Sequence, residues 1–133
     1  MMESIQVEFP GGKCIEANVG AYTIQTDQPV KYGGEASAPA PFDLFLASLA
    51  TCAGIYAWNF CESRKLSTEG LGLRMECIDD EKKKMIVQIK FHLSLPEGFP
   101  EKYRSGIIRA MELCAVKRHM QDSPDFTIEV TMP

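Results

Sequence analysis

The chain has 133 residues, of which 45% are apolar and 24% are charged, and its formal net charge is −4. This length is typical of one domain with its own core, and we predict a single domain over residues 1–133. The acidic balance gives no electrostatic support for binding to nucleic acid or to an anionic membrane. The first residues show neither the basic region nor the apolar region of a signal peptide, so we expect a cytoplasmic protein.

The chain contains five cysteines, an odd number that cannot all pair within one molecule. Stable structural disulfides are uncommon in the reducing cytoplasm. Two cysteines brought together by the fold would therefore indicate thiol redox chemistry rather than a structural cross-link.

Alternating apolar and polar residues predict three strands at the start of the chain, over residues 5–9, 13–19 and 21–27. The sequence Pro10-Gly11-Gly12 is typical of a turn between the first two strands. The start of the chain therefore predicts a small antiparallel sheet.

A loop over residues 28–41, rich in proline and glycine, leads to a long helix predicted over residues 41–64. Asp43 suits the positive end of this helix. The stretch from Leu44 to Cys61 has no charged residue and approaches the length of a membrane span. We interpret it as a helix buried in protein, because amphipathic strands flank it on both sides.

The second half of the chain shows two further strands, a helix and a last strand. A turn at residues 79–83 joins the two strands, and the helix is predicted over residues 100–118. The apolar faces of the three strands are Leu71, Leu73, Met75 and Cys77; Val87, Ile89, Phe91, Leu93 and Leu95; and Phe126, Ile128, Val130 and Met132. The predicted order is βββ-α-ββ-α-β, an α+β fold with a long buried central helix. That helix needs more cover than one chain gives, which favours a homodimer.

Two cysteines lie on predicted core stripes of the two helices. Cys52 shares its stripe with Phe45, Ser48, Leu49, Ile55, Tyr56 and Asn59, and Cys114 shares its own with Tyr103, Ile107 and Met111. Spacing alone favours simple packing, because free cysteine is among the most buried residue types. An ordinary thiol is only about 3% thiolate at pH 7, so reactivity would need a nearby cation or hydrogen-bond donors.

The other candidate groups give weaker signals. Cys77 continues the inward face of its strand, Cys61 lies on the far side of the long helix from Cys52, and Cys14 adjoins a hairpin turn. The i, i+5 separation of Cys114 and His119 disfavours a cysteine–histidine pair. The sequence lacks the ligand spacing of a zinc site and the glycine-rich loops of nucleotide sites, so we expect neither metal nor cofactor.

Two segments around the cysteines carry a resemblance to a known family. The stretch Pro41-Phe-Asp-Leu-Phe-Leu-Ala-Ser-Leu-Ala-Thr-Cys52 resembles the start of the long helix in the OsmC-like, or organic hydroperoxide resistance, family. The segment Glu112-Leu-Cys114-Ala-Val116-Lys-Arg118 is similar to the second-cysteine segment of that family. The predicted order of elements also matches over nearly the whole chain.

The resemblance implies an intertwined homodimer that acts as a cysteine-based peroxidase in the oxidative stress response. Cys52 would attack the distal oxygen of an organic hydroperoxide and become a sulfenic acid. Cys114 would condense with it to a disulfide, which an external dithiol reductant reopens. The resemblance implies no metal, haem or flavin.

The sequence departs from the family pattern at three places. Phe42 stands where a glutamate follows the helix-starting proline, which makes Asp43 the candidate supporting acid. No arginine precedes Arg64, whereas the family uses one from its N-terminal strands, and Ala115 replaces the proline that commonly follows the second cysteine. These departures motivate two alternatives: a non-catalytic OsmC-like dimer that binds a small apolar ligand at its interface, or a redox sensor.

Overall fold

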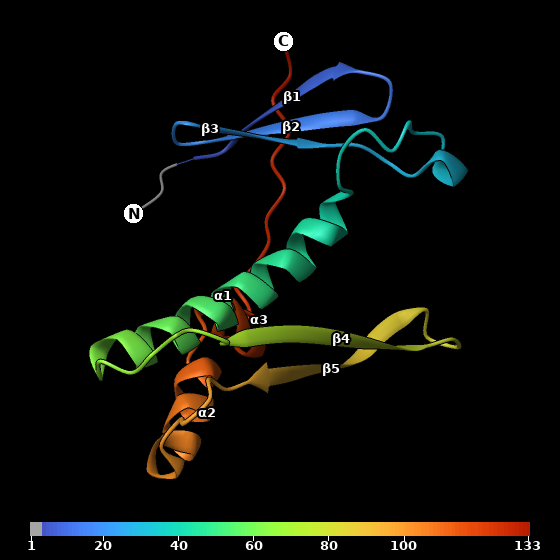
Figure 1. Cartoon of the computed structure of the whole chain (residues 1–133). Coiled ribbons are helices and arrows are strands. Elements are labelled where there is room, and N and C mark those ends of the chain that lie inside the picture. Colours follow the sequence, from blue (N-terminus) through green and yellow to red (C-terminus); the bar gives the residue numbers. More distant parts are fainter. Residues whose placement is uncertain (1–3) are drawn as a thin grey trace. The chain divides into compact units, whose positions relative to one another are not determined.

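The computed structural model describes residues 4–133 and shows an α+β protein whose strands and helices follow the predicted order as far as the second helical region (Figure 1). Residues 1–3, where the N-terminal stretch without a signal-peptide pattern begins, lie outside the described residues. The chain groups into two compact units that divide between Ala47 and Ser48, and each unit is described by itself. The single domain over residues 1–133 stays a prediction.

The first unit contains a three-stranded antiparallel sheet in the order β1-β2-β3. Its strands are β1 (Gln6–Gly11), β2 (Cys14–Val19) and β3 (Tyr22–Thr26), which confirms the three predicted strands. Gly12 has a φ of 60° in the hairpin between β1 and β2, a conformation that glycine adopts without steric cost. The turn predicted at Pro10-Gly11-Gly12 is therefore present for the expected reason.

The carboxylate of Asp27 organises the loop that follows β3. It accepts hydrogen bonds from the backbone N–H groups of Gln28 at 2.7 Å, Glu35 at 3.2 Å and Ser37 at 3.1 Å. The Ser37 hydroxyl donates a fourth, at 2.6 Å. These bonds hold the pKa of Asp27 at about 2, with the bond from the Ser37 hydroxyl contributing most. Asp27 itself is only 1% exposed, so the loop and its short 3₁₀ turn η1 (Val30–Tyr32) are held to a buried charge.

We expect the Asp27→Asn variant to unfold at lower urea concentration than wild type at neutral pH, because an amide nitrogen cannot accept the bonds from Glu35 and Ser37. The folded pKa of Asp27, about 2, lies below its ordinary 3.8. Its stabilisation is therefore fully present above pH 3.8 and is lost as the pH falls through about 2. Urea titrations followed by circular dichroism should show the gap between the two proteins closing toward pH 2. A gap that persists unchanged, or a similar loss in the control Glu35→Gln, whose backbone alone contacts Asp27, would contradict this role.

The long helix α1 (Pro41–Ser63) has the predicted extent, and its start is capped by Asp43. The Asp43 carboxylate accepts the N–H of Ala40 at 3.0 Å, while the Asp43 N–H donates to the Ala40 carbonyl at 2.9 Å. These reciprocal bonds satisfy groups that a helix start otherwise leaves unpaired. The acid after Pro41 therefore has a structural part in the first turn.

The buried face of α1 differs from the predicted stripe. Leu49 lies on both, but Ile55 of the predicted stripe is 50% exposed within the single chain. The buried residues are Leu49, Ala53, Ala57, Phe60 and Cys61. A Cβ added at Gly54 would lie 3.8 Å from the Leu73 side chain, an ordinary van der Waals contact, so this side of α1 faces Leu73. The prediction placed bulky apolar residues such as Ile55 on the buried side of α1, and it therefore assigned the buried face to the wrong side of the helix.

By length and composition α1 could also cross a membrane, although only 28% of its most apolar window is buried inside the single chain. Core helices of other proteins pass the same test. In this fold α1 supplies Ala57, Phe60 and Cys61 to a core cluster completed by Ile107. The packing favours the interpretation of a helix covered by protein.

The second unit pairs β4 (Gly72–Asp80) and β5 (Met85–Ser94) as an antiparallel hairpin. Leu73 lies opposite Leu93, Met75 opposite Phe91, and Cys77 opposite Ile89. The predicted apolar residues of the two strands therefore face each other in register. Such cross-strand pairs are the unit by which a sheet is stabilised.

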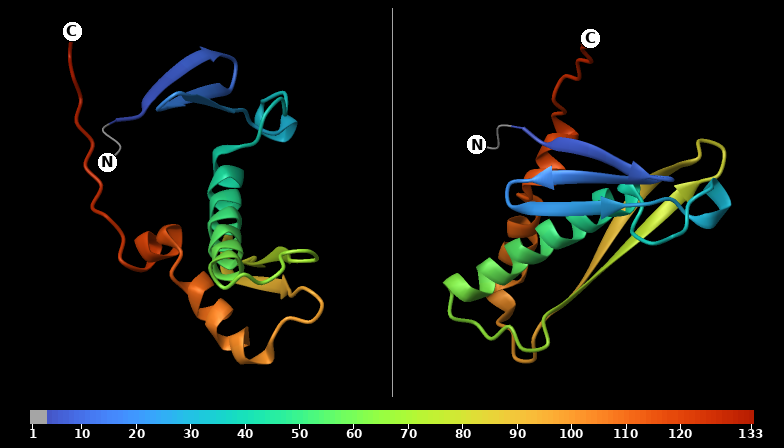
Figure 2. Two further views of the ribbon diagram at one scale, coloured as in Figure 1. Left: turned by 60° about the vertical axis from the view of Figure 1, so that its left-hand side comes forward. Right: turned by 90° about the horizontal axis from the view of Figure 1, so that it is seen from above.

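The helix predicted over residues 100–118 is broken in the structure. A 3₁₀ turn, η2 (Glu101–Tyr103), leads into α2 (Arg104–Glu112), and a separate helix α3 (Ala115–Gln121) follows (Figure 2). Cys114 has φ −48° and ψ 127°, extended values that interrupt the helical hydrogen bonds. Cys114 thus lies at the start of α3 rather than within a helix. The sequence between α2 and α3 has neither glycine nor proline, so its pattern showed no break.

The strand predicted around residues 126–132 is absent from the described chain, which has no helix or strand after α3. Its apolar residues are almost fully exposed: Phe126 88%, Ile128 91%, Val130 80% and Met132 78%. The alternation that predicts a strand is present, but a strand also needs an edge with which to exchange hydrogen bonds. Within the single chain this segment has no such partner strand.

Candidate active site

The structure brings the side chains of Cys52 and Cys114 into hydrogen-bond contact, and both belong to the second unit. Cys52 comes from the middle of α1, and Cys114 from the backbone break between α2 and α3. Cys52 is partly buried and Cys114 is only 2% exposed. The two cysteines singled out in the sequence are therefore neighbours, and both are free thiols.

The surroundings of the pair shift the two thiols in opposite directions. For Cys52, burial is the largest single influence and would raise its pKa. The hydrogen bond from Cys114, the N–H groups of Val116 and Ala115, and the charge of Arg118 together outweigh burial and lower the pKa. For Cys114, burial and then the bond to Cys52 raise the pKa, against the N–H groups of Lys117 and Val116. Cys52 is thus the thiol that ionises first, and the Cys114 thiol donates a hydrogen bond to the resulting thiolate.

The cation near Cys52 is one that the sequence reasoning missed. The family resemblance implies an arginine from the N-terminal strands, but Arg118 lies in α3, one helical turn after Cys114. The Arg118 N–H donates to the Cys114 carbonyl at 3.0 Å, which ties its backbone to that of the second cysteine. Arg118 is part of the second-cysteine segment in the sequence. Its effect on Cys52 follows only from the packing of α3 beside α1.

Ala115 also acquires a part that the sequence did not reveal. Its backbone N–H is one of the donors that lower the pKa of Cys52. A proline at this position would have no N–H to donate. The replacement of the family's proline by alanine therefore adds a donor to this site.

The other candidates are not among the groups that shift the pKa of Cys52 or Cys114. The Asp43 carboxylate is engaged by the Ala40 N–H in the first unit, and its supporting part in catalysis stays a prediction. His119 donates from Nδ1 to the Ala115 carbonyl at 2.6 Å, so this nitrogen is committed to the backbone of its own helix. Cys61 is fully buried, and burial raises its pKa. Cys14 contacts the Ser37 hydroxyl at 3.9 Å, and Cys77 lies in β4.

Metal-binding clusters are not seen in the part of the chain that the structure describes, where no three His, Cys, Asp or Glu side chains converge. The groups that the structure brings together here are the sulfur pair and its hydrogen-bond donors. Two sulfurs in contact, one readily ionised and one holding its proton, can undergo oxidation to a disulfide.

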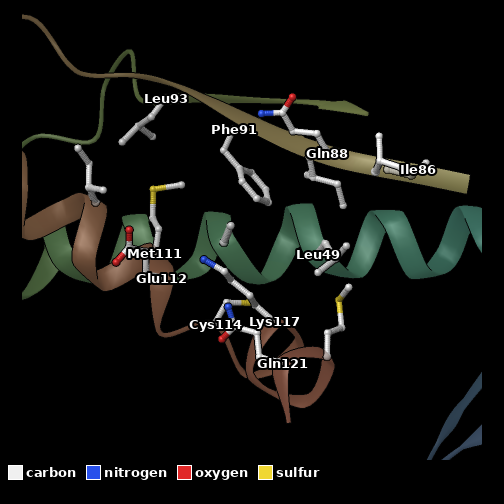
Figure 3. Close-up of a pocket in the computed structure, with 15 residues that line it drawn as sticks. Leu49, Ile86, Gln88, Phe91, Leu93, Met111, Glu112, Cys114, Lys117 and Gln121 are labelled. Atoms are coloured by element: carbon white, nitrogen blue, oxygen red, sulfur yellow. The ribbon is translucent and has the colours of Figure 1, made fainter. Parts of the chain in front are cut away.

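A pocket of about 630 Å³ opens beside the pair, in the second unit (Figure 3). Its volume is typical of a site for a small organic molecule. Leu49 of α1, Phe91 and Leu93 of β5, and Met111 of α2 give it an apolar lining. Cys114 is the only cysteine among the lining residues that the structure describes.

Comparison with known proteins shows the family to which the chain belongs. The sequence model of the family described as OsmC-like protein matches residues 34–129. The chain belongs to the OsmC-like family, which confirms the resemblance found in its two cysteine segments. A search of curated protein sequences gives no significant match.

Three solved structures share the fold. A protein of Psychrobacter arcticus described as an osmotic stress induced and detoxification response protein is 18% identical, with a TM-score of 0.72 over 89% of this chain and 88% of that one. The OsmC like protein of Mycoplasma pneumoniae is 16% identical, with a TM-score of 0.66 over 90% and 87%. The organic hydroperoxide resistance protein OsmC of Legionella pneumophila is 20% identical, with a TM-score of 0.55 over 91% of each chain. The predicted α+β fold is confirmed.

Two substitutions at Cys114 separate its hydrogen bond from its sulfur chemistry. We expect Cys114→Ala to raise the pKa of Cys52, because the donor is lost while burial, the largest influence, remains. Cys114→Ser retains an O–H donor and should keep the pKa of Cys52 closer to that of wild type. The measurement is the pH dependence of Cys52 alkylation by iodoacetamide, read by mass spectrometry of its peptide. Equal pKa values in wild type and both variants would show that the bond has no effect.

Proposed function

We propose that this protein is a thiol-dependent peroxidase that reduces organic hydroperoxides through Cys52 and Cys114. The observation that carries the proposal is the contact between two free thiols whose pKa values are shifted in opposite directions, lowered at Cys52 and raised at Cys114. A two-cysteine peroxidase uses one thiolate to attack and one thiol to resolve, and this difference supports Cys52 as the attacking thiol and Cys114 as the resolving thiol. Family membership and the hydroperoxide-resistance protein among the solved structures also favour it.

In the first step the Cys52 thiolate attacks the distal oxygen of the hydroperoxide. The O–O bond breaks, the distal oxygen stays on sulfur as a sulfenic acid, and the alkoxide leaves as an alcohol after taking a proton. The donors to the Cys52 sulfur, the Cys114 thiol and the N–H groups of Ala115 and Val116, stabilise the thiolate before attack. Arg118 adds a positive charge that favours the same ionised form.

In the second step Cys114 condenses with the Cys52 sulfenic acid. The Cys114 sulfur attacks the Cys52 sulfur, the S–O bond breaks, and the hydroxyl group leaves as water with the proton that Cys114 gives up. Because the two side chains are already in hydrogen-bond contact, this step needs no large movement. An external dithiol then returns the disulfide to two thiols and is itself oxidised.

The proposed working form is a cytoplasmic homodimer that requires no metal, haem or flavin. Within the single chain the side chains of Ile55 and Trp58 in α1 are 50% and 45% exposed. The apolar side chains of the C-terminal segment are exposed to a greater extent. Exposed apolar surface of this kind is typical of an interface. A second copy of the chain is the partner that the family resemblance implies.

Turnover of cumene hydroperoxide with dithiothreitol tests the proposal. We expect Cys52→Ser to lose activity by about 100-fold or more, because a serine hydroxyl does not ionise at neutral pH. Cys114→Ser should still consume roughly one hydroperoxide per chain and then cycle slowly, since the disulfide cannot form. Cys77→Ser, which removes a partly buried thiol of the same unit, is the matched control and should retain wild-type activity.

The same assay discriminates the alternatives. Turnover that survives Cys52→Ser would exclude Cys52 as the reacting thiol. A Cys52–Cys114 disulfide that forms with peroxide but supports little turnover would favour a redox sensor. If the protein shows neither hydroperoxide turnover nor a Cys52–Cys114 disulfide, the non-catalytic ligand-binding dimer would be favoured.

A further inference from the structure

The two sulfurs of the candidate site are close enough to bind one atom together. Cys52 and Cys114 are free thiols whose side chains are in hydrogen-bond contact in the reduced protein. Thiolate sulfur is a soft ligand and prefers soft, polarisable partner atoms. The reduced pair is therefore a bidentate ligand as well as a candidate redox pair.

The contact between the sulfurs favours one geometry of the bound atom. A two-coordinate soft ion such as Cu(I) holds its two sulfurs in a line, on opposite sides of the ion, and would have to push them apart. Trivalent arsenic is pyramidal, so two sulfurs bonded to it at nearly right angles stay in contact with each other. Among the residues that the structure describes, no third His, Cys, Asp or Glu side chain completes a metal cluster with the pair. The pair therefore suits an arsenic atom that offers it two positions and carries a third substituent of its own.

The pocket beside the pair provides room for that third substituent. Cys114 is among its lining residues, whereas Cys52 is not among those that the structure describes. An arsenic atom bonded to both sulfurs would therefore meet the pocket on the side of Cys114. The pocket volume of about 630 Å³ can hold a small organic group.

The lining of the pocket favours a neutral, apolar group. Figure 3 shows Phe91 and Leu93 on the β5 side of the pocket and Met111 on the α2 side. Glu112 and Lys117 are the charged residues among the described lining residues, and their charges are of opposite sign. The lining thus has no net charge that would select an ion, and an alkyl or aryl group gains by leaving water there.

We propose that the reduced Cys52–Cys114 pair captures a monosubstituted trivalent arsenical, whose carbon substituent lies in the pocket. Such a compound carries one carbon group and two hydroxyl groups on arsenic. The Cys52 thiolate displaces the first hydroxide, which leaves as water with a proton from the solvent, and Cys114 displaces the second, which leaves as water with the Cys114 proton. Two As–O bonds break and two As–S bonds form. Arsenic stays trivalent and neither sulfur is oxidised, so the capture needs no co-reactant and does not depend on the peroxidase cycle.

Phenylarsine oxide and the fully reduced protein test the part of the two thiols. We expect titration calorimetry to give one molecule per chain, intact-mass spectrometry to show one added phenylarsenic group, and Cys52 to be protected from iodoacetamide. Cys52→Ser and Cys114→Ser should each weaken binding by about 100-fold or more, because a single As–S bond loses the effective concentration of the second thiol. Cys77→Ser, the matched control, should bind as wild type does. A serine variant of Cys52 or of Cys114 that binds as tightly as wild type would overturn the proposed capture.

Two alkyl arsenicals test the part of the pocket. Methylarsonous acid and butylarsonous acid present the same arsenic group and differ only in the length of the alkyl chain. We expect the butyl compound to bind at least about tenfold more tightly to wild type, because its longer chain is buried in the pocket. Equal affinities would overturn the placement of the carbon substituent.

Two variants in the same strand provide the control for this preference. Val87 lines the pocket and is 52% exposed, so Val87→Asp should fold and should remove most of the preference for the butyl compound. Met85 is 63% exposed and is not among the described lining residues, so Met85→Asp should keep the preference. An equal loss in both variants would contradict the pocket as the binding place.

The capture and the peroxidase function can fail separately, because the binding experiments use reduced protein without any hydroperoxide. Tight, Cys52-dependent binding of phenylarsine oxide by a protein that does not turn over hydroperoxide would overturn the peroxidase function alone. Hydroperoxide turnover by a protein that does not bind phenylarsine oxide would overturn the capture alone.

Discussion

The hydrogen bond between the Cys114 thiol and the Cys52 thiolate is the interaction on which the proposed chemistry depends. Cys114 makes this bond from a position where the backbone leaves the helical conformation, with ψ at 127°. A continuous helix over this segment would bond the N–H groups of Ala115 and Val116 to carbonyls one turn earlier. The break frees these N–H groups, and they lower the pKa of Cys52 together with the Cys114 thiol. Cys114 thus supplies one sulfur of the pair, and its non-helical backbone leaves two N–H groups free to act on Cys52.

Burial and activation oppose each other at this site. Burial alone would raise the pKa of both thiols, and it does so at Cys61, which has only the charge of Arg64 to offset it. The donors to Cys52 act where water is partly excluded, and hydrogen bonds to a charge are stronger in such surroundings. Because Arg118 is exposed, solvent screens its charge, so the three close donors are the main support of the thiolate. These donors lower the pKa of Cys52 in an OsmC-like chain that has no arginine before Arg64.

Much of the fold could be predicted from the sequence, because period-two alternation and turn residues are local signals. The apolar faces of Leu73 and Met75 and of Phe91 and Leu93 follow from those patterns, whereas their register depends on an irregularity between Ile78 and Asp79 that the sequence did not indicate. The break before α3 could not be predicted, since the residues around Cys114 are compatible with a helix and packing decides otherwise. The alternation from Phe126 to Met132 predicted a strand, but a strand forms only where an edge accepts its hydrogen bonds. For the site, the sequence could indicate the two cysteines through their flanking segments, whereas Arg118 and the Ala115 N–H depend on how α3 meets α1.

The pairing of Cys52 with Cys114 is tested most directly by peptide mapping of the oxidised protein. The protein is treated with an equimolar amount of cumene hydroperoxide, denatured, and blocked with N-ethylmaleimide before digestion. We expect one disulfide, joining the peptides of Cys52 and Cys114, with Cys14, Cys61 and Cys77 alkylated. Alkylation of both Cys52 and Cys114, or a disulfide from either of them to another cysteine, would contradict the redox pair.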